Sequence, residues 1–148
     1  MKTIRGAAFE SNSSSSHSIV VSDTKQLLDT ITPDKNGVIV LWGLGVIQHQ
    51  KLTTAIEKAQ YLAGHFVHPY YGEGSNGRVE FDRRKEMFES ALKRHTGATE
   101  ISYTDNVEEC SFDGNGSLND WHIENNLNSE EDFINFLFNP DSALIIDY

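Results

Sequence analysis

Residues 51–67, KLTTAIEKAQYLAGHFV, carry the clearest secondary-structure pattern in the chain. Apolar side chains recur here at spacings of three and four residues, which places them on one face of an α-helix. Pro69 follows, and proline ends a helix because it lacks a backbone N–H. The pattern therefore predicts a helix from Lys51 to Val67 whose buried face consists of Leu52, Ala55, Ile56, Ala59, Leu62, Ala63 and Phe66.

The two ends of the chain predict strands. Lys2–Phe9 and Ser18–Val21 are short β-forming segments on either side of a serine run, as expected for two strands joined by a loop. Towards the other end, Ser129 opens a helix in the manner of a capping box, with Asp132 in place of the usual glutamate. After this helix, Ala143–Ile146 is an apolar run that predicts a buried strand.

The segments between these ends predict two more helices and one central strand. Ser22 can cap a helix in which Leu27, Leu28 and Ile31 share a face. Val38–Trp42 is apolar at every position, as expected for a strand that is covered on both faces. Asp82–Arg94 has a narrow apolar stripe among many charges, which predicts a helix at the surface.

Three further short strands are predicted in the last third of the chain. Ile101–Thr104 and Val107–Phe112 flank the Asp105-Asn106 turn, and a third covers residues 120–124. Strands and helices follow one another without regular βαβ alternation, which favours the α+β class. A length of 148 residues fits one domain. We therefore expect a single domain over 1–148, with a mixed, mostly antiparallel sheet and three to four helices packed on it.

The charge balance is strongly acidic and bears on the class of partner. Twelve Lys and Arg residues against 22 Asp and Glu give a formal net charge of −10. This charge repels phosphate backbones, so it argues against general binding of DNA or RNA and favours a basic partner. The single cysteine, Cys110, suits a reducing compartment. No signal peptide or membrane-spanning run is present, and we expect a soluble cytoplasmic protein.

A polar loop near the start of the chain is the strongest candidate for a site. Asn12, Ser13, Ser14, Ser15 and Ser16 precede a histidine, between two predicted strands. Consecutive backbone N–H groups and hydroxyls can form a concave anion site. Serine and asparagine side chains also bond to their own backbone in ordinary turns, so a self-capped loop is the alternative.

Two histidines and an aspartate are the candidate catalytic residues. His17 closes the serine run and can supply charge or proton transfer to a bound anion. His122 also lies near a predicted strand end, with Asp120 two residues before it. The alternative for each histidine is one local hydrogen bond without any catalytic role.

Other motifs predict no metal or cofactor. His65 and His68 have a spacing that can share a metal, but no third ligand is indicated, and charge at the helix end is the simpler role. Residues 72–77 match G-x-G-x-x-G, yet no strand precedes them, so we expect a mobile loop. A calcium-loop register over 113–124 has Leu118 where glycine is required, which favours a surface turn.

Three stretches of the sequence support a resemblance: TIRGAAFESNSSSSHSIVV at 3–21, LWGLG followed by EKAQYL, and FINFLFNPDSALIID at 133–147. The chain resembles a group of small, largely uncharacterised proteins of bacteriophages and prophages. The resemblance implies a phage accessory gene and marks Phe9–Ser18 as a unit. Related chains tend to have adjacent Asp and His before the last helix, whereas here Trp121 separates them, which weakens the case for a joint role.

These observations lead to three hypotheses of function. The first is a phage-borne accessory protein that acts in the host cytoplasm, where it binds and modulates a host protein, for instance as an anti-CRISPR-like inhibitor of a defence system. The second is a small hydrolase or a nucleotide- or RNA-processing enzyme that uses the serine-rich loop and His17. The third is a virion or assembly component, which only the phage-like resemblance supports.

Overall fold

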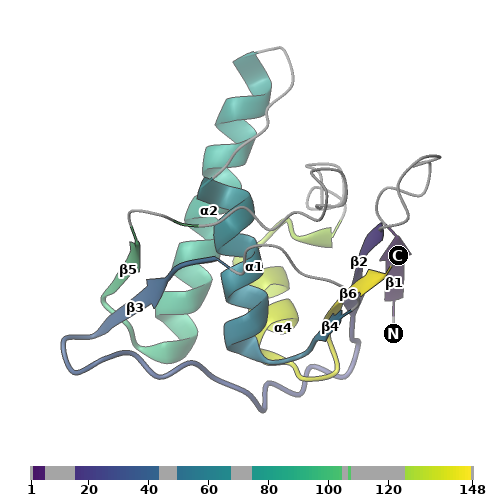
Figure 1. Ribbon diagram of the computed structural model, residues 1–148, viewed down its shortest axis with the longest axis horizontal. Coiled ribbons are helices and arrows are strands. Elements are labelled where there is room, and N and C mark those ends of the chain that lie inside the picture. The colour runs from purple at the N-terminus through teal and green to yellow at the C-terminus, as the bar shows by residue number, and fades with distance from the viewer. Residues whose placement is uncertain are drawn as a thin grey trace.

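The computed structural model describes residues 2–5, 16–43, 50–67, 75–104, 107 and 126–147. It confirms an α+β fold (Figure 1). The elements are β1 (Lys2–Arg5), β2 (Ser16–Val21), β3 (Val38–Leu41), β4 (Gln50–Leu52), α1 (Ala55–Val67), α2 (Ser75–Thr96), β5 (Glu100–Tyr103), α4 (Glu130–Phe138) and β6 (Ala143–Asp147).

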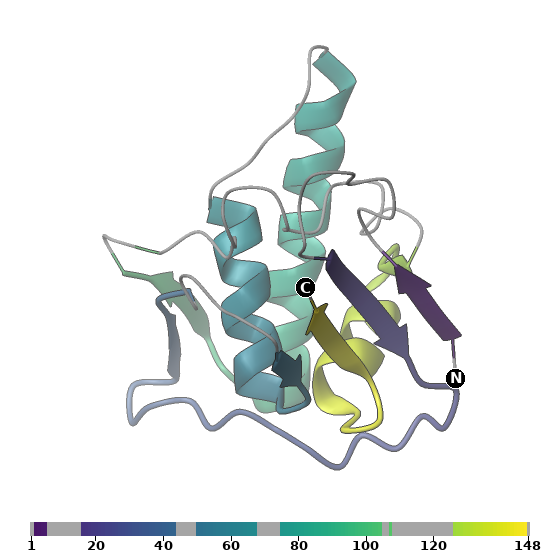
Figure 2. The ribbon, with the colours of Figure 1, turned by 45° about the vertical axis from the view of Figure 1, so that its right-hand side comes forward.

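The larger sheet is antiparallel and has the strand order β1-β2-β6-β4 (Figure 2). Both predicted terminal strands belong to it, because β1 pairs with β2 and β6 lies between β2 and β4. The register places Leu144 opposite Ile19 on one side and opposite Leu52 on the other. All three side chains are at most 1% exposed, so this row of residues joins the sheet to the core.

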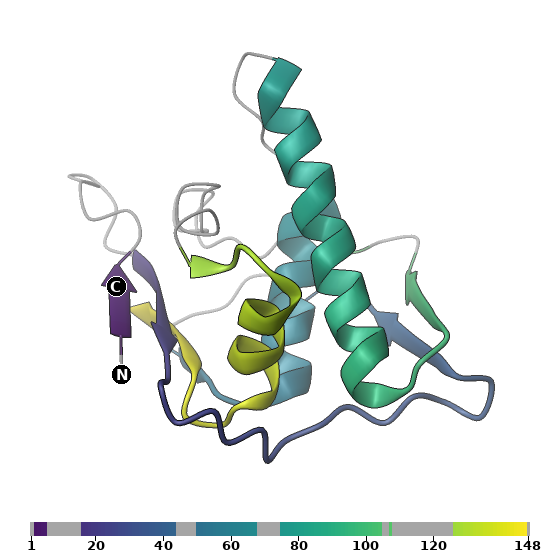
Figure 3. The ribbon, with the colours of Figure 1, turned by 180° about the vertical axis from the view of Figure 1, so that it is seen from behind.

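The three helices lie between this sheet and a second, two-stranded sheet (Figures 1 and 3). Their contact is built on aromatic side chains, since the ring of Phe66 lies 5.3 Å from that of Phe88 and 6.2 Å from that of Phe133. Phe81 packs on the same ring at 5.5 Å. Aromatic pairs at these separations are favourable beyond the area that they bury, so this cluster anchors α1, α2 and α4 to one another.

The N-cap predicted at Ser129 is confirmed, but the reciprocal bond of the predicted capping box is made to the N–H of Asn128, one residue before the cap. The Ser129 hydroxyl accepts a hydrogen bond from the backbone N–H of Asp132 at 3.1 Å. In return, Asp132 Oδ2 accepts from the N–H of Asn128 at 2.9 Å. The first of these bonds satisfies an N–H group that the first turn of a helix cannot pair internally, and the second holds the residue before the cap, so α4 begins at Glu130.

The prediction for α1 is correct except at its start. The helix begins at Ala55, because Gln50–Leu52 forms β4 at the edge of the antiparallel sheet. It ends at Val67, ahead of Pro69, as expected.

The predicted helix over 22–31 is wrong, because this segment has no helical residues. Residues 22–37 instead cross beneath the helices, from β2 on one side to β3 on the other (Figures 1 and 3). Leu27 and Leu28 are 38% and 76% exposed, so they do not form the buried face that the spacing predicted. The hydroxyl of Ser22 accepts from the N–H of Thr24 in a local turn rather than at a helix end.

The strand predicted at Val38–Trp42 is confirmed over Val38–Leu41, but its central position is not. Among the described strands, β3 pairs with β5 alone, in parallel, within the two-stranded sheet. Ile39 and Leu41 face the core and are at most 3% exposed, whereas Val40 is 40% and Trp42 is 54% exposed. An apolar run at every position does not distinguish one covered face from two.

The helix predicted at Asp82–Arg94 is confirmed, but it is longer than predicted and its apolar stripe is buried rather than at the surface. α2 runs from Ser75 to Thr96, so the predicted mobile loop is helical at Ser75–Gly77. Phe88, Ala91 and Leu92 are fully buried, because the narrow stripe packs against the other helices. β5 confirms the strand predicted at Ile101–Thr104. Its predicted hairpin partner lies outside the described residues except for Val107, which is buried and belongs to no strand.

Among the described residues, none of the helices is both long enough and apolar enough to span a membrane.

Candidate functional site

Most of the predicted catalytic and anion-binding residues lie outside the described part of the chain. This holds for Asn12, Ser13, Ser14, Ser15, Asp120 and His122, and also for Cys110, His68 and the calcium-loop register. Ser16 and His17 are the first two residues of β2, where they pair with Asp147 and Ile146 of β6. The roles proposed for all these residues stay predictions.

A groove of about 570 Å³ lies between the segment that follows β2 and one side of α4. It is the candidate site that the described residues offer. Its first wall consists of Val21, Ser22, Asp23, Lys25 and Leu27, and its second wall consists of Glu131, Asp132, Ile134 and Asn135. The two walls are far apart in sequence, so the groove exists only in the folded chain.

The first wall is fixed to the C-terminal part of the chain by hydrogen bonds. The backbone N–H of Ser22 donates to the hydroxyl of Ser142 at 3.0 Å. The amide of Asn135 donates to the carbonyl of Ser22 at 2.9 Å. Because both backbone groups of Ser22 are held, the wall cannot move away from α4 without breaking buried hydrogen bonds.

Asn139 extends this network beneath the groove. Its side-chain amide donates to the hydroxyl of Thr24 and to the amide oxygen of Asn135, each at 3.1 Å. Its amide oxygen accepts from the N–H of Asp141 at 2.9 Å. Asn139 has no exposed surface, and a buried amide with several partners makes the surrounding loop rigid.

The backbone of Lys25 is unusual at this place. Its φ of +54° makes it the one residue other than glycine with a positive φ in the described chain. Left-handed backbone is disfavoured for side chains with a Cβ and persists where surrounding contacts impose it. The bonds at Ser22 and Thr24 supply such contacts just before it.

Asp29 fixes the far end of the first wall to α1 and α4. Its Oδ2 accepts from the N–H of Ala55 at 2.6 Å, so it caps the start of α1 from a distant part of the sequence. Its own N–H donates to the carbonyl of Phe138 at 3.0 Å. The segment is therefore held at both ends, which keeps Lys25 and Leu27 in place beside α4.

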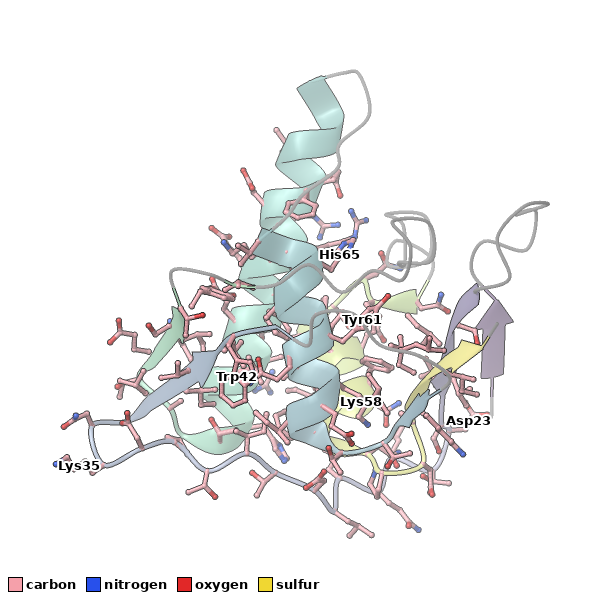
Figure 4. All side chains as sticks on the ribbon, in the orientation of Figure 1. Asp23, Lys35, Trp42, Lys58, Tyr61 and His65 are labelled. Atoms are coloured by element: carbon pink, nitrogen blue, oxygen red, sulfur yellow. The ribbon has the colours of Figure 1, made fainter. Side chains whose placement is uncertain are left out.

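A buried lysine stabilises the turn behind the groove. Lys58 has no exposed surface, and its ammonium donates to the carbonyls of Asn139 at 3.0 Å and Ser142 at 2.8 Å. Its side chain extends from α1 towards the start of β6 (Figure 4). Burial lowers its pKa to about 8, while the carboxylates of Asp29 and Glu57 oppose that shift. Both hydrogen bonds go to the backbone, so Lys58 acts as a structural clamp.

The charges around the groove are mainly negative. Asp23, Glu131 and Asp132 contribute carboxylates, against the single ammonium of Lys25. Glu131 also pairs with Arg94 at 2.7 Å, but its side chain stays 69% exposed. The remaining lining includes Val21, Leu27 and Ile134, which are apolar. A groove lined by both carboxylates and apolar side chains suits a long cationic side chain, because its stem can contact apolar surface and its head can meet a carboxylate.

Of the histidine pair whose spacing could share a metal, His65 lies among the described residues and His68 does not. No group of three His, Cys, Asp or Glu side chains that could hold a metal ion occurs among these residues. His65 lies in the last turn of α1, where the sequence predicted a favourable charge, and its ring contacts Phe66 and Phe81 at 5.1 and 5.6 Å.

Comparison of the chain with protein-family models, curated proteins and solved structures finds no match.

No pattern in the sequence predicted the groove. The helix predicted over 22–31 included Asp23 and Lys25, and nothing in the sequence marked these two residues as part of a site. Ser22 and Thr24 were the available sign, because hydroxyls spaced two apart favour a local turn over a helix. The long-range partners, Asn135 and Ser142, carry no sequence pattern that points to this contact.

Proposed function

We propose that this chain is a phage-borne accessory protein that binds a host protein through the groove beside α4. The observation that carries the proposal is that three carboxylates and three apolar side chains line the same groove, on walls that hydrogen bonds hold in place. A site held in this way loses little conformational entropy when a partner binds. The occupant is a segment of the host protein with arginine or lysine beside an apolar residue.

The net charge of the whole chain supports the same class of partner. At −10, the protein attracts basic surfaces over distances of about one Debye length, which is roughly 10 Å at moderate salt. Such attraction raises association rates and selects against acidic partners. In many proteins, basic surfaces serve to bind the phosphate backbone of nucleic acids. More specifically, the chain inhibits a defence protein that binds nucleic acid, because it competes with the nucleic acid for the basic groove of that protein.

The proposal is tested by charge and polarity changes within the groove. The host protein that copurifies with the wild-type chain is identified, purified, and bound to variants in a calorimeter at low and high salt. Leu27→Glu combined with Glu131→Lys alters the lining and should lower the affinity at least about tenfold. The affinity of the wild type should fall as salt rises.

Two changes outside the groove serve as matched controls. Leu28→Glu introduces the same charge at the next residue, an exposed leucine that does not line the groove. Glu86→Lys reverses an exposed charge on α2. Both should bind within about twofold of the wild type. Equal losses in groove and control variants, or no copurifying host protein, would overturn the proposal.

The hydrolase hypothesis stays a prediction, because the loop that carries it lies mainly outside the described residues. It expects His17→Ala to abolish turnover of a phosphate-bearing substrate and to leave the fold intact. Far-ultraviolet circular dichroism checks the fold in the same preparation.

A further inference from the structure

A second surface combines exposed apolar residues at the end of β3. Val40 in the strand is 40% exposed, and Trp42, which directly follows the strand, is 54% exposed. On the neighbouring strand, Val40 is level with Ser102. Trp42 and Asp23 lie on either side of α1, so this surface is separate from the groove (Figure 4).

Neither side chain belongs to the buried core of the described residues. The opposite face of β3 supplies the core contacts through Ile39 and Leu41, which are at most 3% exposed. A tryptophan that leaves about half of its surface in water forgoes much of the stabilisation that burial provides. Tryptophan is also among the residue types that dominate binding energy at protein interfaces.

Backbone groups at both ends of the free edge of β3 already have hydrogen-bond partners, and this decides how a partner can dock. At the start, Asp34 accepts from the N–H of Val38 through Oδ1 at 3.0 Å, and its own N–H donates to the Val38 carbonyl at 2.9 Å. At the end, Gln60 Oε1 accepts from the N–H groups of Trp42 at 2.8 Å and Gly43 at 3.0 Å. An added strand needs these groups, so a partner docks on the face.

The charges near this face favour a cationic partner. Glu100 is exposed and is level with Val38 on the same face, and Asp34 is exposed in the turn before β3. Lys35 is the one basic residue in that turn, and the whole chain carries −10. An indole is the best ring for cation–π contacts, and guanidinium groups stack on it as flat plates.

We propose that the exposed surface of Val40 in β3 and of Trp42 just after it is a second docking face, and that its occupant is an arginine-bearing surface of a basic protein. This face goes beyond the groove beside α4 and does not depend on it. The guanidinium lies over the indole, Val40 supplies apolar contact, and Glu100 attracts neighbouring basic residues.

Site-specific photocrosslinking tests the proposal in host cells. The photoreactive residue p-benzoylphenylalanine replaces Val40, and in a matched strain it replaces Val79, which is 65% exposed on α2. The expected result is a crosslink from position 40, but not from position 79, to a protein that mass spectrometry identifies as basic. A crosslink to a second copy of this chain, to an acidic protein or to nothing would overturn the proposal.

Affinity for that purified protein supplies the second measurement. Trp42→Ala should weaken binding at least about tenfold, and Val79→Ala should change it less than about twofold. Leu27→Glu with Glu131→Lys should leave the crosslink from position 40 in place, which separates failure of this face from failure of the groove. If thermal unfolding shows that Trp42→Ala is destabilised, Val40→Thr repeats the test. Unchanged affinity in folded variants would overturn the proposal.

Discussion

Lys58 should make the protein more stable as the pH rises from 7 towards 9.5. Burial lowers the pKa of its ammonium from 10.5 to about 8 in the folded protein. Between these two values the unfolded chain binds a proton that the folded chain has released. Stability increases with pH wherever the unfolded state binds more protons, so the penalty for burying the charge is present below pH 8 and disappears above it.

The size of this effect follows from the two pKa values. Each pH unit between them is worth about 1.4 kcal/mol, so the full penalty is about 3 kcal/mol. About 2 kcal/mol of it should be recovered between pH 7 and pH 9.5. Tyr103 does not interfere in this range. Burial raises the pKa of its hydroxyl above 10, so its effect begins above pH 10 and lowers the stability there.

The assay compares urea unfolding of three proteins at pH 7, 8.5 and 9.5. Lys58→Met removes the buried ammonium, and Lys35→Met removes an exposed one as the matched control. Between pH 7 and pH 9.5 the free energy of unfolding of the wild type should rise by about 2 kcal/mol more than that of Lys58→Met. Lys35→Met should show the same rise as the wild type. The Lys58 Cε resonance should titrate near pH 8. Parallel pH curves for Lys58→Met and the wild type would refute the reasoning.

Two further predictions concern packing and backbone conformation. Phe88→Ala should lower the free energy of unfolding by about 3–5 kcal/mol, because the ring is fully buried, and Val79→Ala should change it by under about 0.5 kcal/mol in the same urea assay. Gly97 and Gly37 both have a φ near +80°, but only at Gly37 would a new Cβ lie 2.8 Å from the Thr99 hydroxyl. Gly97→Ala should therefore cost about 1–2 kcal/mol and Gly37→Ala distinctly more, as differences in melting temperature will show; equal losses would contradict the steric argument.

Local patterns were sufficient to predict the elements whose main contacts follow their own periodicity. The helix that became α1 and the buried strand that became β6 were found because one repeating apolar face, or one short apolar run, packs on the core. The cap at Ser129 was predictable because its partner is three residues away. The α+β class then followed from the mixture of elements.

Long-range hydrogen bonds explain what the sequence could not reveal. Leu27, Leu28 and Ile31 have helical spacing, but Asp29 between them bonds to Ala55 and Phe138, and these contacts hold the segment outside any helix. The groove follows from that irregular path, so the part of its first wall beyond Val21 could not be predicted. The serine run differs in composition from the rest of the sequence. Asp23 and Lys25 have no such signal, and they become part of a site only because the fold places them beside α4.

The position of β6 in the antiparallel sheet has a consequence for synthesis of the protein in the cell. β6 follows every other element in the chain, yet it lies between β2 and β4. On the ribosome, β2 and β4 therefore have no common neighbour until residues 143–147 leave the exit tunnel. Until then, the edges of both strands are open to other chains, and the helices can form before the sheet. We expect nascent chains to need protection during this interval, and ribosomes stalled before residue 143 to hold a chain without the completed sheet.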